Sequence, residues 1–162
     1  MFKQIIAYAG LAVMAMAGPA GSQESPPKSA EQPLRIGATM SITGKAYSVQ
    51  GGYGREGYLL CQKHVNARGG VLGRPIELVI YDDESDEKTA ARLYEKLIIE
   101  DKVDAVLGPY GTAITEAVAD VPEKYRKVMT APNAATTSIW EKGRRYLIHG
   151  ARASRLRRGR RA

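Results

Sequence analysis

The chain has 162 residues and a formal net charge of +7, but six arginines gathered in residues 152–162 account for most of this charge. Without them the chain carries only +1, whereas a nucleic-acid-binding domain usually spreads its basic residues over one face of the fold. The composition therefore argues against a domain built for nucleic acid. A basic-tailed nucleic-acid-binding fragment stays open as an alternative that depends on the tail alone.

The first residues have the pattern of an export signal. One cation, Lys3, precedes an apolar stretch over residues 5–17, and small residues suited to signal peptidase extend to Ala20. A membrane anchor is the alternative, although the stretch is only marginally long enough to span a bilayer. We predict a cleaved signal peptide at residues 1–20 and a flexible polar leader at residues 21–33.

The chain has one cysteine, Cys61, so it cannot form an internal disulfide. Cys61 shares one face of a predicted helix with Tyr58 and Val65. Its apolar neighbours favour a small buried side chain over a reactive thiol. We therefore expect Cys61 to be buried.

From Leu34 onwards, short apolar runs alternate with segments of helical period. The apolar runs predict strands at residues 34–40, 76–81, 104–108, 127–131 and 146–150. The segments between them predict helices. The second helix is expected to be capped by Ser85 or Asp86, and the third to kink at Pro122 or restart there behind Asp120. This order predicts an α/β fold, a Rossmann-like parallel sheet with helices on both faces.

Three loops follow the first, third and fourth predicted strands, at residues 41–52, 108–112 and 132–137. In parallel sheets, ligands bind beyond the carboxyl ends of the strands, where such loops lead into helices. Gly111 allows a sharp turn before Thr112, whose hydroxyl and backbone N–H suit a carboxylate. Helix capping is the alternative role for Thr112.

Other polar and aromatic groups in these loops extend the candidate site. Asn133 and Thr136 offer hydrogen-bond donors and acceptors in the third loop. Tyr47 and Tyr110 are candidates for the apolar walls of a small pocket, with an ordinary surface position as the alternative for each.

Enzyme motifs are weak in this sequence. Residues 52–57 read GYGREG, which matches G-x-G-x-x-G and keeps a dinucleotide-binding enzyme domain as an alternative. However, the motif begins eleven residues after Ser41 rather than directly after the strand. The acidic run DDESDE at 82–87 is expected to be a solvated turn with a helix cap. His64 and His149 have no motif-spaced nucleophile or metal partner, so we expect a binding protein without catalytic residues, metal or cofactor.

Four segments within residues 34–150 occur in a specific order: LRIGATMSITG, VNARGGVLGRPIELVIYDDESDEKTA, VDAVLGPYGT and TAPNAATT. Together they closely resemble the amino-terminal lobe of the leucine/isoleucine/valine-binding proteins, the periplasmic solute receptors of branched-chain amino acid ABC importers. The resemblance implies one lobe of a type I periplasmic binding protein. It also implies a periplasmic location, a small-molecule solute such as an amino acid, an ABC transporter permease as partner of the full-length protein, and no specific nucleic acid.

The same resemblance implies roles for the loop residues. Thr112 occupies the position that holds the ligand carboxylate, and Tyr110 and Gly111 shape the turn before it. The loop that contacts the ammonium and carboxylate groups comprises Asn133, Ala134, Ala135 and Thr136.

The sequence also departs from the family pattern. Ser85 and Gly111 stand where some members have a disulfide, and Asn133 stands where receptors for hydrophobic amino acids often have alanine. The second lobe, with its acidic partner for the ammonium group, is not in this chain. We interpret residues 151–162 as an out-of-frame or truncated end, because the hydrophobic pattern stops there.

Overall fold

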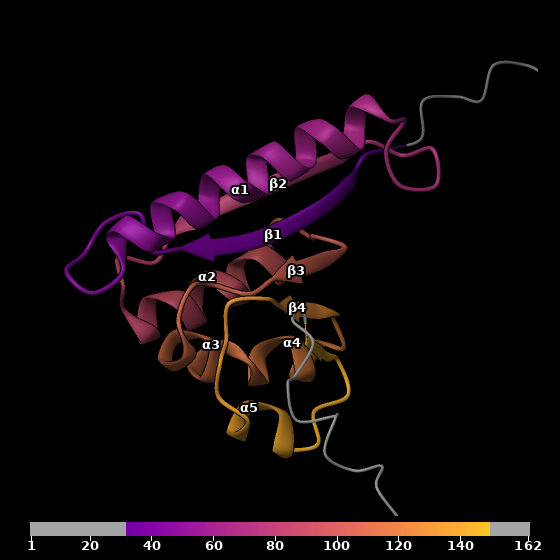
Figure 1. Ribbon diagram of the computed structural model, residues 1–162. Coiled ribbons are helices and arrows are strands. Elements are labelled where there is room, and N and C mark those ends of the chain that lie inside the picture. Colours follow the sequence, from indigo (N-terminus) through magenta and orange to yellow (C-terminus); the bar gives the residue numbers. More distant parts are fainter. Residues whose placement is uncertain (1–31, 150–162) are drawn as a thin grey trace, which may run out of the picture.

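A computed structural model describes residues 32–149, except for the side chain of His149 (Figure 1). The predicted signal peptide, nearly all of the predicted leader and the arginine-rich tail lie outside these residues. The described part contains a five-stranded parallel sheet with strand order β2-β1-β3-β4-β5. The strands are β1 (Leu34–Met40), β2 (Ile76–Asp82), β3 (Ala105–Leu107), β4 (Met129–Ala131) and β5 (Leu147–His149). The predicted parallel sheet is confirmed.

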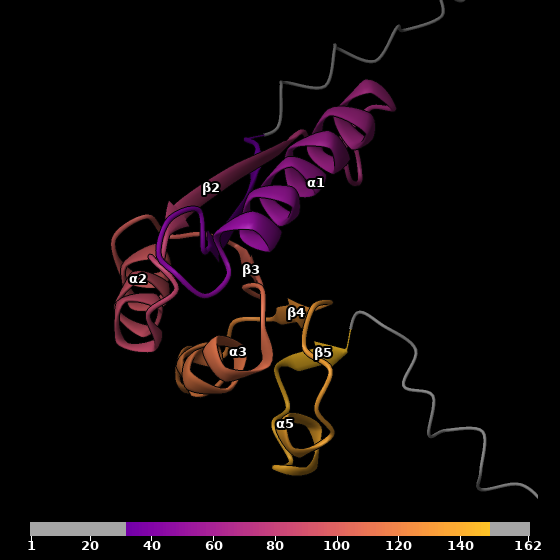
Figure 2. The same ribbon diagram turned by 60° about the vertical axis from the view of Figure 1, so that its left-hand side comes forward.

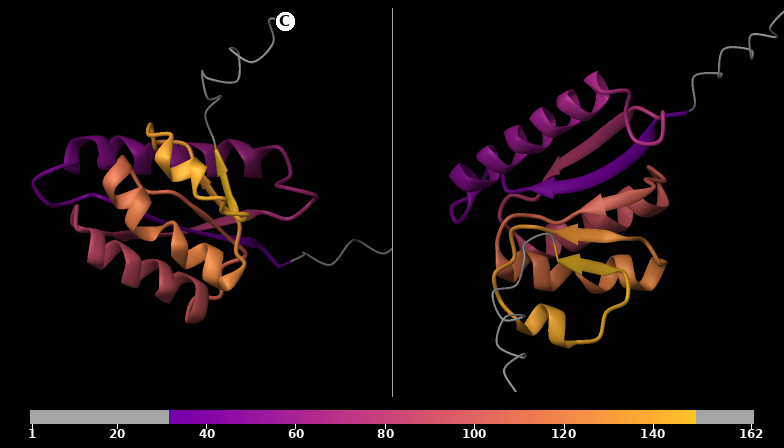
Figure 3. Two further views of the ribbon diagram at one scale, coloured as in Figure 1. Left: turned by 90° about the horizontal axis from the view of Figure 1, so that it is seen from below. Right: turned by 45° about the vertical axis from the view of Figure 1, so that its right-hand side comes forward.

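Helices lie on both faces of this sheet, as predicted. They are α1 (Ser48–Ala67), α2 (Glu87–Ile99), α3 (Thr112–Val118), α4 (Asp120–Tyr125) and α5 (Ser138–Glu141). Figure 2 and the left view of Figure 3 show α1 on one side of the strands and α2 on the other. Within residues 32–149, no helix has both the length and the apolar character needed to cross a bilayer.

The helix boundaries follow from local chemistry. Asp86 precedes α2 and its side chain accepts a hydrogen bond from the Thr89 backbone N–H at 2.7 Å, which confirms Asp86 as the cap. The predicted break in the third helical segment is also present, because α4 restarts at Asp120 with Pro122 in its first turn. The short helix α5 is not predicted by the sequence pattern, since four residues are too few to display helical periodicity.

The main core lies between α2, α3 and the sheet. Its fully buried side chains include Tyr94, Leu97, Val103, Ile114, Val118 and Met129. α2 also packs closely on β1: a Cβ atom added to Gly37 would lie 3.0 Å from a Leu97 methyl carbon. Glycine at this position therefore lets the helix and strand approach each other.

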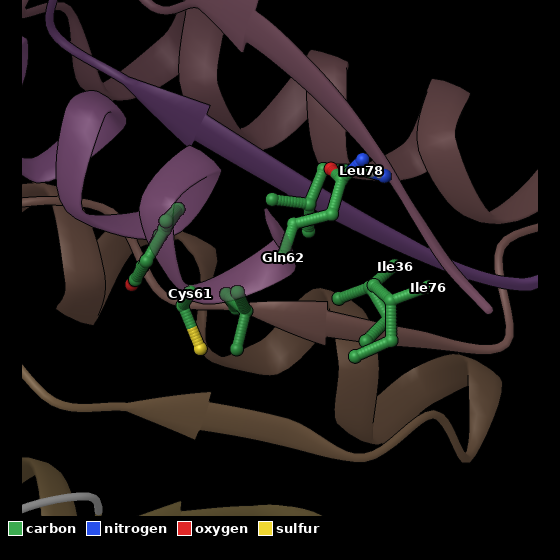
Figure 4. A pocket seen from close by; sticks show the side chains of 7 residues that line it. Ile36, Cys61, Gln62, Ile76 and Leu78 are labelled. Carbon is green, nitrogen blue, oxygen red and sulfur yellow. Dashed lines mark hydrogen bonds between the residues drawn. The ribbon is translucent and has the colours of Figure 1, made fainter. Parts of the chain in front are cut away.

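The face covered by α1 is packed more loosely. Gly51 is the one buried residue of α1, and an apolar hollow of about 190 Å³ lies between this helix and the strands. Figure 4 shows Cys61 and Gln62 from α1 beside Ile36, Ile76 and Leu78 from β1 and β2. Cys61 is exposed, so its predicted burial is wrong. Helical periodicity correctly places Cys61 at an apolar region, the hollow between α1 and the strands. It does not show whether another helix or strand covers the thiol, and within residues 32–149 the thiol is left exposed.

The exposure of Cys61 leads to a direct test. We expect the thiol to react with a disulfide reagent in the native protein, without denaturant, because solvent reaches it. The reaction is followed by the absorbance of the released thiolate, and the urea-unfolded chain supplies the reference rate. Labelling that requires urea would show instead that Cys61 is covered in solution.

Candidate functional site

The order of the strands creates a switch point between β1 and β3. From β1 the chain passes through α1 to β2 on one side, and from β3 it passes through α3 and α4 to β4 on the other. The loops that leave β1 and β3 therefore diverge at the carboxyl edge of the sheet. In open α/β sheets, this divergence forms the crevice in which ligands bind.

Two tyrosines hold the end of β3 at this crevice from opposite faces of the sheet. Tyr58 of α1 donates a hydrogen bond to the Gly108 carbonyl at 2.9 Å, and Tyr94 of α2 donates one to the Leu107 carbonyl at 2.5 Å. Burial raises the pKa of both hydroxyls well above the usual tyrosine value. Both side chains therefore remain neutral donors, and they fix the strand end from which the glycine-rich loop begins. Neither role is predicted by the sequence pattern.

The adjacent acids Asp82 and Asp83 organise the loop that follows β1. Asp83 is fully buried and accepts hydrogen bonds from the Thr39 hydroxyl at 2.8 Å and the Ser41 hydroxyl at 2.6 Å. Asp82 accepts from the backbone N–H groups of residues 42 and 43. The prediction of a solvated turn is therefore wrong for Asp83, because this residue directly follows β2 and its side chain is buried against Thr39 and Ser41 of the neighbouring chain segment.

The pKa of Asp82 gives the loop a defined pH dependence. Burial opposes ionisation, but hydrogen bonds from Thr43, Glu84 and Ile42 outweigh it and hold the pKa of the carboxyl below its usual value. A carboxylate of this kind stabilises the fold above its unfolded-state pKa of about 3.9, and the contribution is lost as the pH falls through the lower folded value.

We therefore expect the backbone amide signals of Ile42 and Thr43 to stay constant from neutral pH down to about pH 4 and to shift below it. The measurement is a pH titration by two-dimensional NMR. Asp82→Asn is the matched variant, since it removes the titrating group and keeps a hydrogen-bond acceptor. The same titration curve in both proteins would assign the shift to another group.

Tyr47, in the loop after β1, contacts the loops after β2 and β3. Its backbone N–H donates to the Ser85 hydroxyl at 3.3 Å, and its ring lies 5.8 Å from the ring of Tyr110 at an angle of 58°. Gly111 has a φ of +91°, and a Cβ atom added there would lie 3.4 Å from the Tyr47 ring. Tyr47 thus contacts both positions at which some members of the resembled family carry a disulfide.

Thr112 joins the loop after β3 to the loop after β4. α3 begins at Thr112, and Gly111 precedes it in the cap position, so the hydroxyl does not cap this helix. Instead, Thr112 Oγ1 accepts a hydrogen bond from the Ala135 backbone N–H at 3.4 Å. Ala134 is buried beside this contact, whereas Thr136 is exposed. The predicted residues of the two loops are therefore brought together, with Thr136 at their outer side.

A hollow of about 290 Å³ opens at the same edge. It is lined by Gln50, Tyr53, Gly54, Tyr110 and Asn133. Tyr110 and Asn133 are predicted site residues, whereas the three residues from α1 are not. Gln50, Tyr53 and Gly54 are spaced i, i+3 and i+4 and so share one face of α1. This spacing identifies them as candidate site residues once the structure shows that this face of α1 lies at the hollow.

The structure gives no support to the dinucleotide alternative. The glycines of GYGREG lie inside α1, where they cannot form the turn that brings pyrophosphate to a helix N-terminus. Asp82 and Asp83 are occupied by the hydrogen bonds to the β1 loop. In the part of the chain that the structure describes, no group of three or more histidine, cysteine, aspartate or glutamate side chains could hold a metal ion.

A Rossmann-like lobe with polar loops at its switch point defines a class of ligand-binding domains. Within that class, the family model described as periplasmic binding protein matches residues 33–154. The chain therefore belongs to the periplasmic binding protein family.

Known members of the family resemble this chain over most of its length. The leucine-, isoleucine-, valine-, threonine- and alanine-binding protein of Pseudomonas aeruginosa is 30% identical over 115 residues, which are 71% of this chain and 30% of that protein. The leucine-specific-binding protein of Salmonella typhimurium is 30% identical over 55% of this chain and 24% of its own length.

Solved structures give the same result. The branched-chain amino acid transporter substrate-binding protein LivJ from Streptococcus pneumoniae, in complex with isoleucine, has a TM-score of 0.69 and 29% identity. This match covers 74% of the present chain and 34% of LivJ. The leucine-binding protein LivK of Thermotoga maritima has a TM-score of 0.64 and 26% identity over 72% of this chain. The chain thus spans about a third or less of the length of these relatives.

Proposed function

We propose that this chain is the amino-terminal lobe of a periplasmic substrate-binding protein of an ABC importer, and that its crevice holds an amino acid or a related small carboxylate or amide. The observation that carries the proposal is the meeting of the β3–α3 and β4–α5 loops at the carboxyl edge of the sheet, next to the switch point, where Thr112 contacts Ala135 close to an open hollow. The relatives with comparable sequences are substrate-binding proteins, and this supports a binding role without catalysis.

The proposed contacts follow from the loop chemistry. The positive φ of Gly111 turns the backbone sharply before Thr112, and the N–H groups of the first helical turn, which have no partner within the helix, suit a carboxylate. Thr112, Ala135 and Asn133 supply the remaining polar atoms, and the paired rings of Tyr47 and Tyr110 form a rigid wall beside them.

The wider organisation is proposed from the sequence pattern and from the relatives. Residues 34–150 form the lobe, residues 1–20 form a signal peptide that directs export to the periplasm and is then removed, and residues 21–33 form a flexible leader. In the longer receptors, a second lobe closes on the solute in a hinge motion, supplies the acidic group for the ammonium and allows the closed protein to engage the permease.

A single lobe leaves the solute open to water, so we expect weak binding with a Kd in the millimolar range. Titration of the isotope-labelled chain with an amino acid should shift the backbone N–H signals of Thr112 and Ala135. Thr112→Ser keeps the hydroxyl and should bind like the native chain, whereas Thr112→Val removes the hydroxyl at nearly constant shape and should weaken binding several-fold. Unmoved signals at the carboxyl edge with every amino acid tested would refute the proposed function.

A further inference from the structure

The walls of the carboxyl-edge hollow are polar and aromatic. Among its lining residues are two side-chain amides, Gln50 and Asn133, two tyrosines and one glycine, and no aliphatic side chain. The apolar hollow beside α1 has the opposite character, since Ile36, Ile76, Leu78 and Leu107 line it (Figure 4). The two hollows of this lobe thus differ in the chemistry that they offer to a ligand.

The two amides have free hydrogen-bonding capacity. Within residues 32–149, no hydrogen bond of the protein engages the side-chain amide of Gln50 or Asn133. Gln50 is exposed at the start of α1, and Asn133 is half-buried in the loop after β4. Each amide has two N–H donors and one carbonyl acceptor. A ligand that covers them must replace their bonds to water, or leave the groups desolvated and unpaired at an energetic cost.

The side-chain amides of Gln50 and Asn133 come from different parts of the chain and line the same hollow. Gln50 belongs to the first turn of α1, and Asn133 belongs to the loop that also carries Ala135, the partner of Thr112. Tyr110 and Asn133 line the hollow and lie two residues before Thr112 and Ala135, so a solute held at Thr112 by its carboxylate lies beside this hollow. A side group that enters the hollow meets the two amides. A branched aliphatic side group would pack there against tyrosine rings, but it would also cover two amides without giving them a hydrogen bond.

We infer that this hollow selects solutes whose side group forms hydrogen bonds, a carboxamide or a hydroxyl, over those with a branched aliphatic side group. The inference rests on the proposed function and specifies the class of solute. A site built to hydrogen-bond a polar group rejects an analogue of the same shape that lacks it, because the site's own groups are then left unpaired.

Asparagine and leucine form the decisive pair of probes, because their side chains have nearly the same shape and differ in polarity. The isotope-labelled full chain is titrated with each amino acid, and the backbone N–H signals of Thr112 and Ala135 and the side-chain amide signals of Gln50 and Asn133 are followed. We expect asparagine to bind about tenfold more tightly than leucine and to shift both side-chain amides.

Variants assign the preference to these residues. Gln50→Ala and Asn133→Ala should each reduce the ratio of asparagine to leucine affinity, and the double variant should remove it. Lys63→Ala, an exposed position on the same helix, is the matched control and should leave the ratio unchanged.

The possible results distinguish a failure of the proposed selectivity from a failure of the proposed binding function. Equal affinities for asparagine and leucine, with backbone shifts at Thr112 but static amide signals of Gln50 and Asn133, would overturn the selectivity and leave the proposed function in place. Unmoved Thr112 and Ala135 signals with both amino acids would overturn the proposed function itself. The ratio of asparagine to leucine affinity is first measured on the native chain. That measurement therefore tests both proposals even if a variant fails to fold.

Discussion

Gly51→Ala is expected to lower the free energy of unfolding by about 3 kcal/mol, although alanine normally favours a helix over glycine. The reason is the contact between α1 and the end of β1. A Cβ atom on residue 51 would lie 2.1 Å from the carbonyl oxygen of Ser41 and 2.6 Å from its carbonyl carbon. Both atoms belong to the backbone, so neither can rotate away, and the loop or the helix must move.

Two other glycines of the same helix provide the controls. A Cβ atom on Gly52 or Gly57 would meet no atom within 4 Å. Gly52→Ala and Gly57→Ala are therefore expected to raise the free energy of unfolding by about 0.5–1 kcal/mol each, the ordinary gain from alanine in a helix. Urea denaturation of the four proteins measures the differences. A Gly51→Ala protein as stable as the Gly52→Ala protein would mean that the close approach at Ser41 is absent in solution.

Asp83→Ala is expected to lower the free energy of unfolding by a similar amount, about 3 kcal/mol. The substitution removes the acceptor for the Thr39 and Ser41 hydroxyls and for the Ser85 backbone N–H, which donates to it at 3.1 Å. Since Asp83 and both hydroxyl residues are fully buried, water cannot readily replace the lost carboxylate.

Asp83→Asn should cost less than Asp83→Ala, because the amide keeps one acceptor oxygen and hydroxyl groups can rotate to accept from its NH₂ group. Asp86→Ala is the control for loss of a nearby acid. It removes the α2 cap at an exposed position and should cost about 1 kcal/mol. Equal losses for Asp83→Ala and Asp86→Ala in urea denaturation would contradict the dominant role of the buried carboxylate.

The contrast between Asp82 and Asp83 illustrates the limit of sequence reasoning at the site. The apolar runs were sufficient to predict all five strands and their parallel arrangement, because chain connectivity leaves few alternatives for such an order. The run DDESDE, however, presents its acids as equivalent. Their roles differ only in the folded chain, where Asp83 is buried against Thr39 and Ser41 while Asp82 binds the backbone of the loop after β1.

The same limit applies to α1. Helical spacing grouped Tyr58, Cys61 and Val65 on one face, yet the burial of Cys61 depends on what packs over it. Likewise, the spacing of Gln50 and Tyr53 places them on one face, but the rotation of α1 about its axis decides whether that face meets the crevice. Both properties arise from packing between elements that are distant in sequence, which a single periodic pattern does not encode.

The position of Tyr47 has a consequence for how the carboxyl edge is assembled. A disulfide between the loops after β2 and β3 would require an oxidant and could form with the wrong partner. Here, a hydrogen bond to Ser85 and a ring contact with Gly111 and Tyr110 connect the same loops. These non-covalent contacts form and break reversibly as the chain folds. The loops at this edge are therefore held together whether the protein's surroundings are oxidising or reducing.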